Sequence, residues 1–233
     1  MIRILEFLTA GLIAAAAMQA TGSAQIESRY AAKDITGDTD PNSAFWRGVK
    51  GVFIEGNALG NPEPAYRSEV RSRWTKDNLY LLFVCPFEQL NLKPNPSTTT
   101  ETNQLWNWDV AEAFIGHDFQ NIRQYKEFEL SPQGEWVDLD IDRDHPKEQG
   151  GWMWNSGIQV SARIDQAAHV WYGFMRIPYA SIDPHPAAAG NLLRINFYRA
   201  QAASPERKLL AWRPTGKNNF HVPEAFGTMK LVK

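Results

Sequence analysis

Residues 66–84 read YRSEVRSRWTKDNLYLLFV, and this stretch contains the pattern that decides the fold. Two runs rich in Val, Leu, Trp, Tyr and Phe flank a short polar break at 76–78. Runs of this kind, when turn-forming residues bound them, are typical of the two strands of a hairpin. The stretch therefore predicts neighbouring strands at 66–74 and 79–84.

The same pattern repeats along the chain, and no helical period of any length competes with it. The PQG sequence at 132–134 predicts a second tight connection. About ten strands joined by short turns predict an all-β fold, a two-sheet antiparallel β-sandwich of the jelly-roll or immunoglobulin-like kind. The remaining strands are expected at 109–115, 125–130, 136–142, 157–164, 170–177, 193–200, 209–213 and 227–232.

The N-terminus has the features of a secretory signal peptide. Arg3 precedes an apolar run at 7–18, and small residues suit cleavage after Ala24. The run is short for a bilayer span, although a membrane anchor helix remains the alternative. We therefore expect a secreted or periplasmic protein that is free of the membrane after cleavage. The expected organisation is a signal peptide at 1–24, an N-terminal segment at 25–44 and one domain at 45–233.

Charge and cysteine content limit the partners and the chemistry. The chain of 233 residues has 24 basic and 26 acidic side chains, and neither sign forms a long run. A nucleic acid or an anionic membrane would find no broad basic patch, so we expect neither as a partner. Cys85 is the single cysteine and lies in an apolar run, which predicts a buried, inert thiol and excludes an intrachain disulfide.

Seven short motifs follow one another in order over residues 45–233. In this order they resemble the family 9 carbohydrate-binding modules first found attached to xylanases, part of a DOMON-like group of β-sandwiches. The resemblance implies a non-catalytic domain that binds the end of a glucan or xylan chain between two aromatic faces. Its partners would be an oligosaccharide or polysaccharide and a separate glycoside hydrolase. The motifs are VRSRWTKDNLYLLF, LWNWDVAEAFI, EFELSPQGEW, WYGFMRIP, INFYR, AWRP and FHVPEAFG.

The resemblance also assigns site residues. The family pattern W-x-x-D-x-x-E falls on Trp106, Asp109 and Glu112, and Trp106 would supply the first aromatic face. The second face falls on Phe220, three residues before Pro223, where the best-known members have Trp. We expect both rings at the rim of the site, facing each other across the sugar.

Two polar positions depart from the family pattern, which leaves the identity of the sugar open. Glu129 stands where the family has an arginine, and the family asparagine falls at or beside Lys217 and Asn218. The other polar candidates for carbohydrate binding are Asn219, His221 and Arg199.

Alternation along 109–115 (DVAEAFI) gives Glu112 a reason to bind hydroxyls. The odd-numbered residues from Asp109 to Ile115 would face the core, and Glu112 would face the other side between two large apolar neighbours. A carboxylate in such surroundings needs hydrogen-bond donors or water. A pair of sugar hydroxyls would supply the donors, and an ordinary solvated glutamate remains the alternative.

The other tryptophans divide between core and loop. Trp152 and Trp154 lie in the expected loop 143–156 and could extend the site, whereas five tryptophans fall in or beside strand patterns. The tryptophans expected in the core are Trp74, Trp108, Trp136, Trp171 and Trp212.

Asp138, Asp140 and Asp142 share one face of an expected strand and are candidates for a structural calcium site. The surrounding DLDIDRD sequence lacks the glycine and the final glutamate of an EF-hand loop. A solvated acidic face answered by basic side chains is the alternative. The resemblance keeps calcium open, because the family often carries structural calcium.

Signals for catalysis are few, since the motifs of serine hydrolases, zinc proteases and phosphate-binding loops are absent from the sequence. Hydrolysis of a glycosidic bond by paired carboxylates stays an alternative, because the fold sets their separation. Another alternative is a haem b-binding β-sandwich for electron transfer. Its ligands would be Met153, Met175 or Met229 with His117 or His221.

Overall fold

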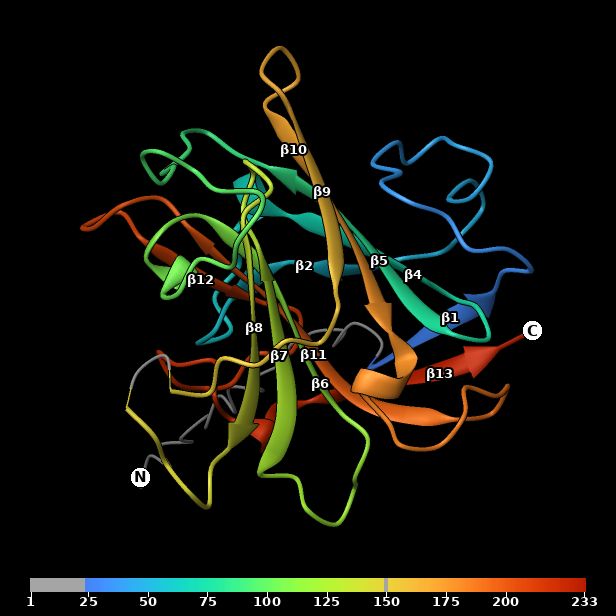
Figure 1. Ribbon diagram of the computed structural model, residues 1–233. Helices are drawn as coiled ribbons and strands as arrows, with labels where there is room; N and C mark the ends of the chain where they lie inside the picture. Colours follow the sequence, from blue (N-terminus) through green and yellow to red (C-terminus); the bar gives the residue numbers. More distant parts are fainter. Residues whose placement is uncertain (1–23, 149–150) are drawn as a thin grey trace, which may run out of the picture.

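The computed structural model describes residues 24–148 and 151–233 of the chain. Within these residues the fold is all-β, with thirteen strands and four single turns of 3-10 helix (Figure 1). The strands are β1 (Gln25–Tyr30), β2 (Val52–Ile54), β3 (Gly56–Asn57), β4 (Ser68–Trp74), β5 (Asn78–Pro86), β6 (Val110–Gly116), β7 (Gln124–Leu130), β8 (Trp136–Asp142), β9 (Gln159–Asp165), β10 (Val170–Pro178), β11 (Leu192–Gln201), β12 (Lys208–Ala211) and β13 (Gly227–Val232). The 3-10 turns are η1 (Pro64–Tyr66), η2 (Leu105–Asn107), η3 (Tyr179–Ser181) and η4 (Pro223–Ala225).

All the strands expected from the sequence are present, and their ends differ from the expected ones by two residues or fewer. The sequence pattern missed β1, β2 and β3. Strands β2 and β3 have three and two residues, which is too short for alternation to show. Strand β1 reads QIESRY and lies directly after the expected signal peptide, so its two buried positions did not stand out. These strands are defined by their partners more than by their own residues.

The strands form one hydrogen-bonded path in the order β8-β7-β6-β11-β13-β1-β4-β5-β10-β9. Strand β1 is parallel to both β13 and β4, whereas the other neighbours along this path are antiparallel. The expected all-β sandwich is confirmed, whereas in place of two antiparallel sheets the strands follow one continuous path that includes a parallel strand. Because β1 uses both of its edges, it joins a β6 half (β8, β7, β6, β11 and β13) to a β5 half (β4, β5, β10 and β9) in a nearly closed sandwich.

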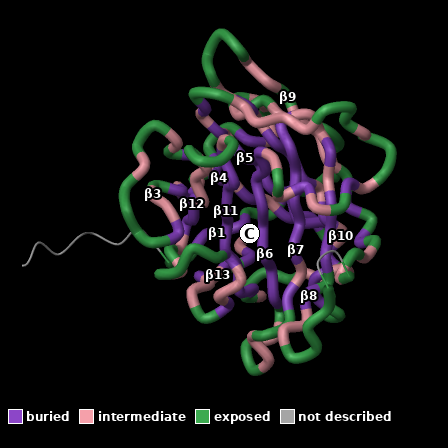
Figure 2. The backbone as a smooth tube through the Cα atoms, turned by 90° about the vertical axis from the view of Figure 1, so that its left-hand side faces the viewer, coloured by how far each residue is buried: buried purple, intermediate pink, exposed green. Residues whose placement is uncertain are grey.

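The main core lies between the inner faces of the two halves. Val70 and Phe83 of the β5 half belong to the same buried apolar cluster as Ala113 and Phe197 of the β6 half. The rings of Phe83 and Phe197 meet edge to face, with their centroids 5.9 Å apart. The odd-numbered residues of 109–115, expected on the core face, are all buried. Figure 2 shows buried strands at the centre of the molecule and exposed loops around them.

The outer face of the β6 half is also buried, although one face of an antiparallel sheet is often in water. All seven residues of β6 are buried. Phe114 of β6, Tyr125 of β7 and Tyr198 of β11 belong to a second apolar cluster on this outer face. Phe114 stacks on Tyr125 with centroids 5.5 Å apart and meets Tyr198 edge to face at 4.9 Å. The outer face of β6 therefore provides a rigid apolar base on which a site can be built.

Side chains expected in the core are mostly found there. Trp74, Trp171 and Trp212 are buried, whereas Trp108 and Trp136 are half-buried. Cys85 is fully buried, and burial raises the pKa of its thiol to about 11. Because the thiolate is the reactive form, this thiol is inert at neutral pH, as expected.

Residues 25–44, expected as a separate N-terminal segment, are tied to the domain. Ile26 of β1 is 2% exposed and belongs to the main core. Tyr80 of β5 donates a hydrogen bond of 2.6 Å to the Asp34 carboxylate. Just after this segment, Trp46 is fully buried with Tyr80 and Phe174 on the outer face of the β5 half. The folded unit therefore includes β1 and the segment that follows it.

The expected signal peptide at 1–24 lies outside the described residues except for Ala24. The Ala24 carbonyl oxygen accepts a hydrogen bond of 2.9 Å from the Thr228 amide, just before β1 begins beside β13. No helix within 24–148 or 151–233 is long and apolar enough to cross a bilayer.

The place of β1 predicts a stability effect. Ile26→Ala should lower the free energy of unfolding by about 2–5 kcal/mol, because it removes a buried side chain from the main core. Glu27→Ala is the control, since the side chain of Glu27 is exposed on the same strand. Chemical denaturation of both variants measures the difference. Equal midpoints for Ile26→Ala and the wild type would mean that β1 is not part of the folded unit.

Candidate functional site

A cavity of about 630 Å³ opens over the outer face of the β6 half. Aromatic side chains, carboxylates and side-chain amides share its lining. The lining residues are Asn91, Trp106, Asn107, Glu112, Phe114, Glu127, Leu139, Ile141, Trp152, Ala200, Ala203, Ser204, Arg207, Leu209, Asn218, Asn219, Phe220 and His221. The cavity therefore brings together six of the eight residues predicted for carbohydrate binding, Trp106, Glu112, Phe220, Asn218, Asn219 and His221.

Trp106 lies on the 3-10 turn η2, immediately before β6. The turn is anchored by Leu105, which is fully buried in the second apolar cluster, and is closed by a 3.0 Å hydrogen bond from the Trp108 amide to the Leu105 carbonyl. Trp106 itself is half-buried at the cavity wall, in agreement with the predicted rim position. A short, anchored turn holds the ring in place at little entropic cost on binding.

Asp109 holds the loops around the cavity and does not line it. Its carboxylate accepts hydrogen bonds from the Asn91 amide at 3.1 Å, from Gln201 Nε2 at 2.8 Å and from the Ala202 amide at 2.7 Å. Burial raises the pKa of this carboxyl to about 6 in spite of these bonds. Asp109 therefore ties the start of β6 to the long loop before it and to the end of β11.

Arg207 is a residue of the cavity that the sequence did not single out. It lies between β11 and β12 and donates hydrogen bonds to the carbonyl oxygens of Trp106 and, at 3.2 Å, of Ala202. These contacts connect its loop to the turn that carries Trp106. Its positive charge lowers the pKa values of Glu112 and Glu129, although burial outweighs this effect.

Phe220 is held more tightly than a rim residue. Its ring stacks on Tyr198 with centroids 4.2 Å apart and an interplanar angle of 17°. The Tyr198 hydroxyl also donates a hydrogen bond of 3.0 Å to the Phe220 carbonyl oxygen, and Phe220 is 9% exposed. The ring thus lines the same cavity as Trp106, but one of its faces is already covered. The expectation of an exposed ring is corrected for this residue.

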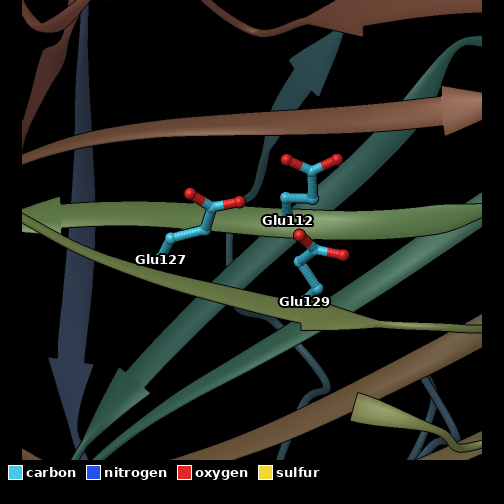
Figure 3. Close-up of side chains that lie close together, drawn as sticks. All are labelled: Glu112, Glu127 and Glu129. Atoms are coloured by element: carbon cyan, nitrogen blue, oxygen red, sulfur yellow. The ribbon is translucent and has the colours of Figure 1, made fainter. Parts of the chain in front are cut away.

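The side chains of three glutamates, Glu112, Glu127 and Glu129, lie close together (Figure 3), and the first two line the floor of the cavity. Glu112 of β6 is directly opposite Glu129 of β7, and Glu127 lies two residues before Glu129 on the same face. One carboxylate oxygen from each lies within 4.8 Å of the others, and the three residues are 3% exposed or less. Among the described residues, no hydrogen-bond donor reaches Oε2 of Glu127 or either carboxylate oxygen of Glu129.

This arrangement changes the acidity of all three groups. Burial, as the largest cause, raises the pKa of Glu127 to about 7 and raises the pKa values of Glu112 and Glu129 well above their ordinary range. Repulsion between neighbouring carboxylates adds to the effect for Glu112 and Glu129. Burial therefore shifts all three glutamates toward their protonated forms when the cavity is empty of donors.

His221 contributes no compensating charge. Its Nδ1 forms a hydrogen bond of 2.8 Å with the Tyr125 hydroxyl, and its Nε2 lies 4.0 Å from the Glu127 carboxylate. Burial lowers the pKa of His221 to about 4, so the ring is neutral at neutral pH. The histidine serves the cavity as a polar, uncharged wall.

Two predicted site residues lie away from the cavity lining. Arg199 of β11 pairs with Ala111 of β6 and points to the inner side, where it donates to Ser68 Oγ at 2.7 Å and to the Pro86 carbonyl at 3.0 Å. Its place in a sugar site is therefore corrected, because it braces the core between the halves. Glu129 lies behind the lining and reaches the site through its neighbouring glutamates.

The loop tryptophans are placed on opposite sides of β8. Trp152 lines the cavity, and its carbonyl oxygen accepts a hydrogen bond of 2.8 Å from the Asp140 amide. Trp154 packs against Phe128 on the core side, with ring centroids 6.4 Å apart. Trp152 alone therefore extends the cavity.

The three aspartates predicted as calcium ligands have separate partners. Asp138 accepts a hydrogen bond of 2.6 Å from the Ser156 amide, Asp140 pairs with Lys126 at 2.5 Å, and Asp142 bonds His145. Over the described residues, the group of His, Cys, Asp and Glu side chains close enough to share an ion is that of the three floor glutamates. The aspartates fit the alternative of an acidic face answered by local donors.

The side chains named for haem are also dispersed. Met175 and Met229 are fully buried in the main core, whereas His221 lines the cavity on the outer face. Met153 is exposed, and it shares a different hollow with His117.

The buried glutamates predict a dependence of stability on pH. In the folded protein Glu127 and Glu129 bind protons more tightly than at the usual pKa of 4.5, so their contribution favours folding below about pH 4.5. This contribution is lost as the pH rises through their raised folded pKa values, which is about 7 for Glu127. His221 acts in the opposite direction, because its folded pKa is lowered from 6.5 to about 4. The difference in stability between a glutamate variant and the wild type isolates the contribution of the glutamates, because His221 is present in both proteins. Glu129→Gln should gain stability over the wild type as the pH rises from about 5 to about 8.

Urea denaturation across this pH range measures the gain. Glu224→Gln is the control, because Glu224 is an exposed carboxylate on η4. A constant difference between Glu129→Gln and the wild type at every pH would contradict the buried, proton-retaining cluster.

Two named proteins share limited identity with this chain. An extracellular protein of Arthroderma benhamiae is 24% identical over 169 residues, which are 67% of this chain and 70% of that protein. Endo-1,4-beta-xylanase A of Thermotoga neapolitana is 19% identical over 207 residues, which are 88% of this chain and 18% of the xylanase. The chain therefore corresponds to a small part of the xylanase.

Solved structures share the fold. A carbohydrate-binding module of family 9 from Caldicellulosiruptor kristjanssonii, in complex with glucose, superposes with a TM-score of 0.63 at 14% identity, covering 89% of this chain and 95% of that one. A family 9 module from the same organism in complex with cellotriose gives a TM-score of 0.59 at 16% identity, covering 89% and 93%. At this identity the likeness concerns the fold.

The family of the chain follows from a match over most of its sequence. Residues 35–233 match the family described as "Carbohydrate family 9 binding domain-like". This range includes the turn that carries Trp106, the three glutamates of the floor and the loop of Phe220. The chain therefore belongs to the carbohydrate family 9 binding domain-like family, as its motifs predicted.

Proposed function

We propose that this chain is a non-catalytic carbohydrate-binding module whose cavity holds the end of a glucan or xylan chain. The observation that carries the proposal is a cavity of about 630 Å³ in a chain of this family, with Trp106 and Phe220 in its wall and Glu112 at its floor. Its volume is within the range of about 300–1,000 Å³ that is usual for small-molecule sites.

The aromatic wall supports binding of a flat, apolar sugar face. The C–H face of a pyranose can stack on Trp106, which is half-buried and anchored through Leu105. Such stacking contributes about 1–3 kcal/mol per ring, by analogy with bases on aromatic side chains. Phe220 has one face on Tyr198 and offers the sugar its remaining surface. Trp106 is therefore the main stacking residue.

The polar lining supports recognition of hydroxyl groups. Glu112 reaches the cavity from β6, and the amides of Asn218 and Asn219 line it from the loop that leads to Phe220. A carboxylate accepts two hydrogen bonds from neighbouring hydroxyls, and side-chain amides both donate and accept. Donors from a sugar would relieve a floor that lacks them.

The comparisons guide the choice of sugar. Structural neighbours of this chain are family 9 modules in complex with glucose and with cellotriose, and a xylanase is among its relatives. We therefore place glucan and xylan ends first among the ligands to be tested.

The cellular role proposed here is the support of polysaccharide breakdown or uptake by a secreted or periplasmic protein. The signal-like sequence at 1–24 and a relative that is named an extracellular protein support export. The xylanase relative supports a separate glycoside hydrolase as partner, which the module would hold close to its substrate. High local concentration of the bound polysaccharide would be its benefit to such an enzyme.

Two aromatic variants test the site. Trp106→Ala should weaken cellotriose binding by about 1–3 kcal/mol, or roughly 5- to 150-fold in Kd, and leave the unfolding midpoint nearly unchanged. Phe220→Ala should weaken binding and also destabilise the fold, because it removes a stacked, buried ring. Isothermal titration calorimetry and thermal denaturation separate the two effects.

Trp136→Ala is the matched control, since Trp136 is half-buried but lies outside the cavity lining. The wild type should bind cellotriose or xylotriose in this assay. Heatless titrations of the wild type with both sugars at millimolar concentration would refute the proposed function.

The absence of catalysis is a separate prediction. Cellotriose and xylotriose kept with the protein for a day should show no new reducing ends above a protein-free control. Release of reducing ends that disappears in Glu112→Gln would instead show that the floor glutamates hydrolyse the sugar.

A further inference from the structure

Three carboxyl groups lie close together at the floor of the cavity, more than are needed to bind neutral hydroxyls. Glu112 and Glu127 line the cavity, and Glu129 lies beside them with both carboxylate oxygens unpartnered and no exposed surface. Ionised carboxylates accept hydrogen bonds and cannot donate them, so the three glutamates can bond to one another only while some of them retain protons. A nearby positive charge favours the ionised form of each carboxyl. A ligand that brings both donors and positive charge would stabilise this group best.

The cavity supplies little positive charge of its own. Among its lining residues, Arg207 is the permanent cation, and its guanidinium donates to backbone carbonyl oxygens, including those of Trp106 and Ala202. His221 is neutral at neutral pH because burial lowers its pKa to about 4. Arg207 is therefore the one permanent cation that the described lining offers to the glutamates, and both terminal nitrogens of its guanidinium already donate to backbone carbonyl oxygens.

An ammonium group fits the geometry of the floor. Charge-assisted N–H···O bonds are about 2.7–2.9 Å long, and a tetrahedral nitrogen therefore holds two acceptor oxygens about 4.5 Å apart. One carboxylate oxygen from each of the three glutamates lies within 4.8 Å of the others.

A divalent metal ion fits less well. Calcium takes about six to eight oxygen ligands. The side chains that share this outer face with the glutamates include Phe114 and Leu139, which offer no oxygen, and the asparagines lie in the exposed loop before Phe220. Three carboxylates would supply six oxygens only if each bound through both of its oxygens, and any remaining ligands would be water.

We propose that the cavity selects sugars that carry a protonated amino group, with the ammonium of a glucosamine-type residue on Glu112 and Glu127 and the charge of Glu129 behind them. This inference rests on the proposed sugar-binding function and narrows it to chain ends of de-N-acetylated amino-sugar polymers. The aromatic wall would hold the sugar ring, and the glutamates would bind the substituent at its carbon 2.

Three trisaccharides with the same β-1,4 linkage test the inference on the unmodified protein. The glucosamine trimer, cellotriose and the N-acetylglucosamine trimer differ only in an ammonium, a hydroxyl or an acetamide at carbon 2. Calorimetric titration at pH 6 in the presence of a chelator should give a Kd for the glucosamine trimer at least about tenfold lower than for cellotriose. The N-acetylated trimer should bind more weakly than the glucosamine trimer, because it has no charge.

Variants locate the source of the preference. Glu129→Gln should reduce the ratio of the two Kd values to within about threefold, because it removes one charge and keeps the shape. Glu127→Gln provides the same test if Glu129→Gln does not fold, as judged by thermal denaturation. Glu224→Gln changes the net charge equally on the exposed η4 turn and should retain the full ratio.

The outcomes distinguish failure of the amino-sugar inference from failure of the proposed sugar-binding function. Equal or tighter binding of cellotriose would overturn the amino-sugar inference and leave the proposed function standing. Cellotriose binding that requires added calcium, with no advantage for the glucosamine trimer, would assign the glutamates to a metal ion and also overturn it. Failure of all three sugars to bind, with xylotriose silent as well, would remove the proposed function and the inference together.

Discussion

Strand β6 is buried on both faces, and the rest of the structure depends on this constraint. Its odd-numbered residues pack into the core between the halves, and its even-numbered residues, with Glu112 among them, form part of the cavity floor. A strand in this position cannot shift by one residue without placing a carboxylate in the main core and an alanine in the cavity. The fold therefore fixes the floor of the site with the register of its central strand.

The same constraint explains the electrostatics of the cavity. Burial of three carboxylates without donors is unfavourable, and the protein tolerates it by retaining protons, which the raised pKa values express. The buried carboxylates lower the stability of the fold, and they leave acceptor oxygens at the floor for a ligand with many hydrogen-bond donors. Asp109 and Arg207 act on the surrounding loops, since both tie the segment of Trp106 to the end of β11. Binding then requires little rearrangement.

Much of this fold could be predicted from the sequence, because most of its strands are rich in β-forming residues and turn residues mark their ends. The parallel strand β1 could not, since its partners β13 and β4 lie far along the chain. Trp106, Glu112 and Phe220 followed from motif spacing and share one cavity. The prediction that Arg199 lies at the sugar site was wrong, because Arg199 pairs with Ala111 and its side chain therefore lies on the core side of β11.

Glu127 and Arg207 show the other limit of sequence reasoning. Glu127 was not singled out, although it is two residues from Glu129 on a predicted strand and alternation would place both on one face. Their meeting with Glu112 depends on the pairing of β6 with β7. Arg207 follows β11 in a loop without a recognisable motif and reaches the cavity through backbone contacts. Clusters formed across strands thus require the register, which local sequence does not contain.

A crystal structure of the protein with a bound β-1,4-linked trisaccharide would show whether the cavity binds the end of a sugar chain. We expect the terminal ring in the cavity, with its C–H face on Trp106, an edge against Phe220 and the substituent at carbon 2 within hydrogen-bond distance of Glu112. A sugar bound elsewhere on the molecule, with the cavity filled by water and Trp106 untouched, would contradict it.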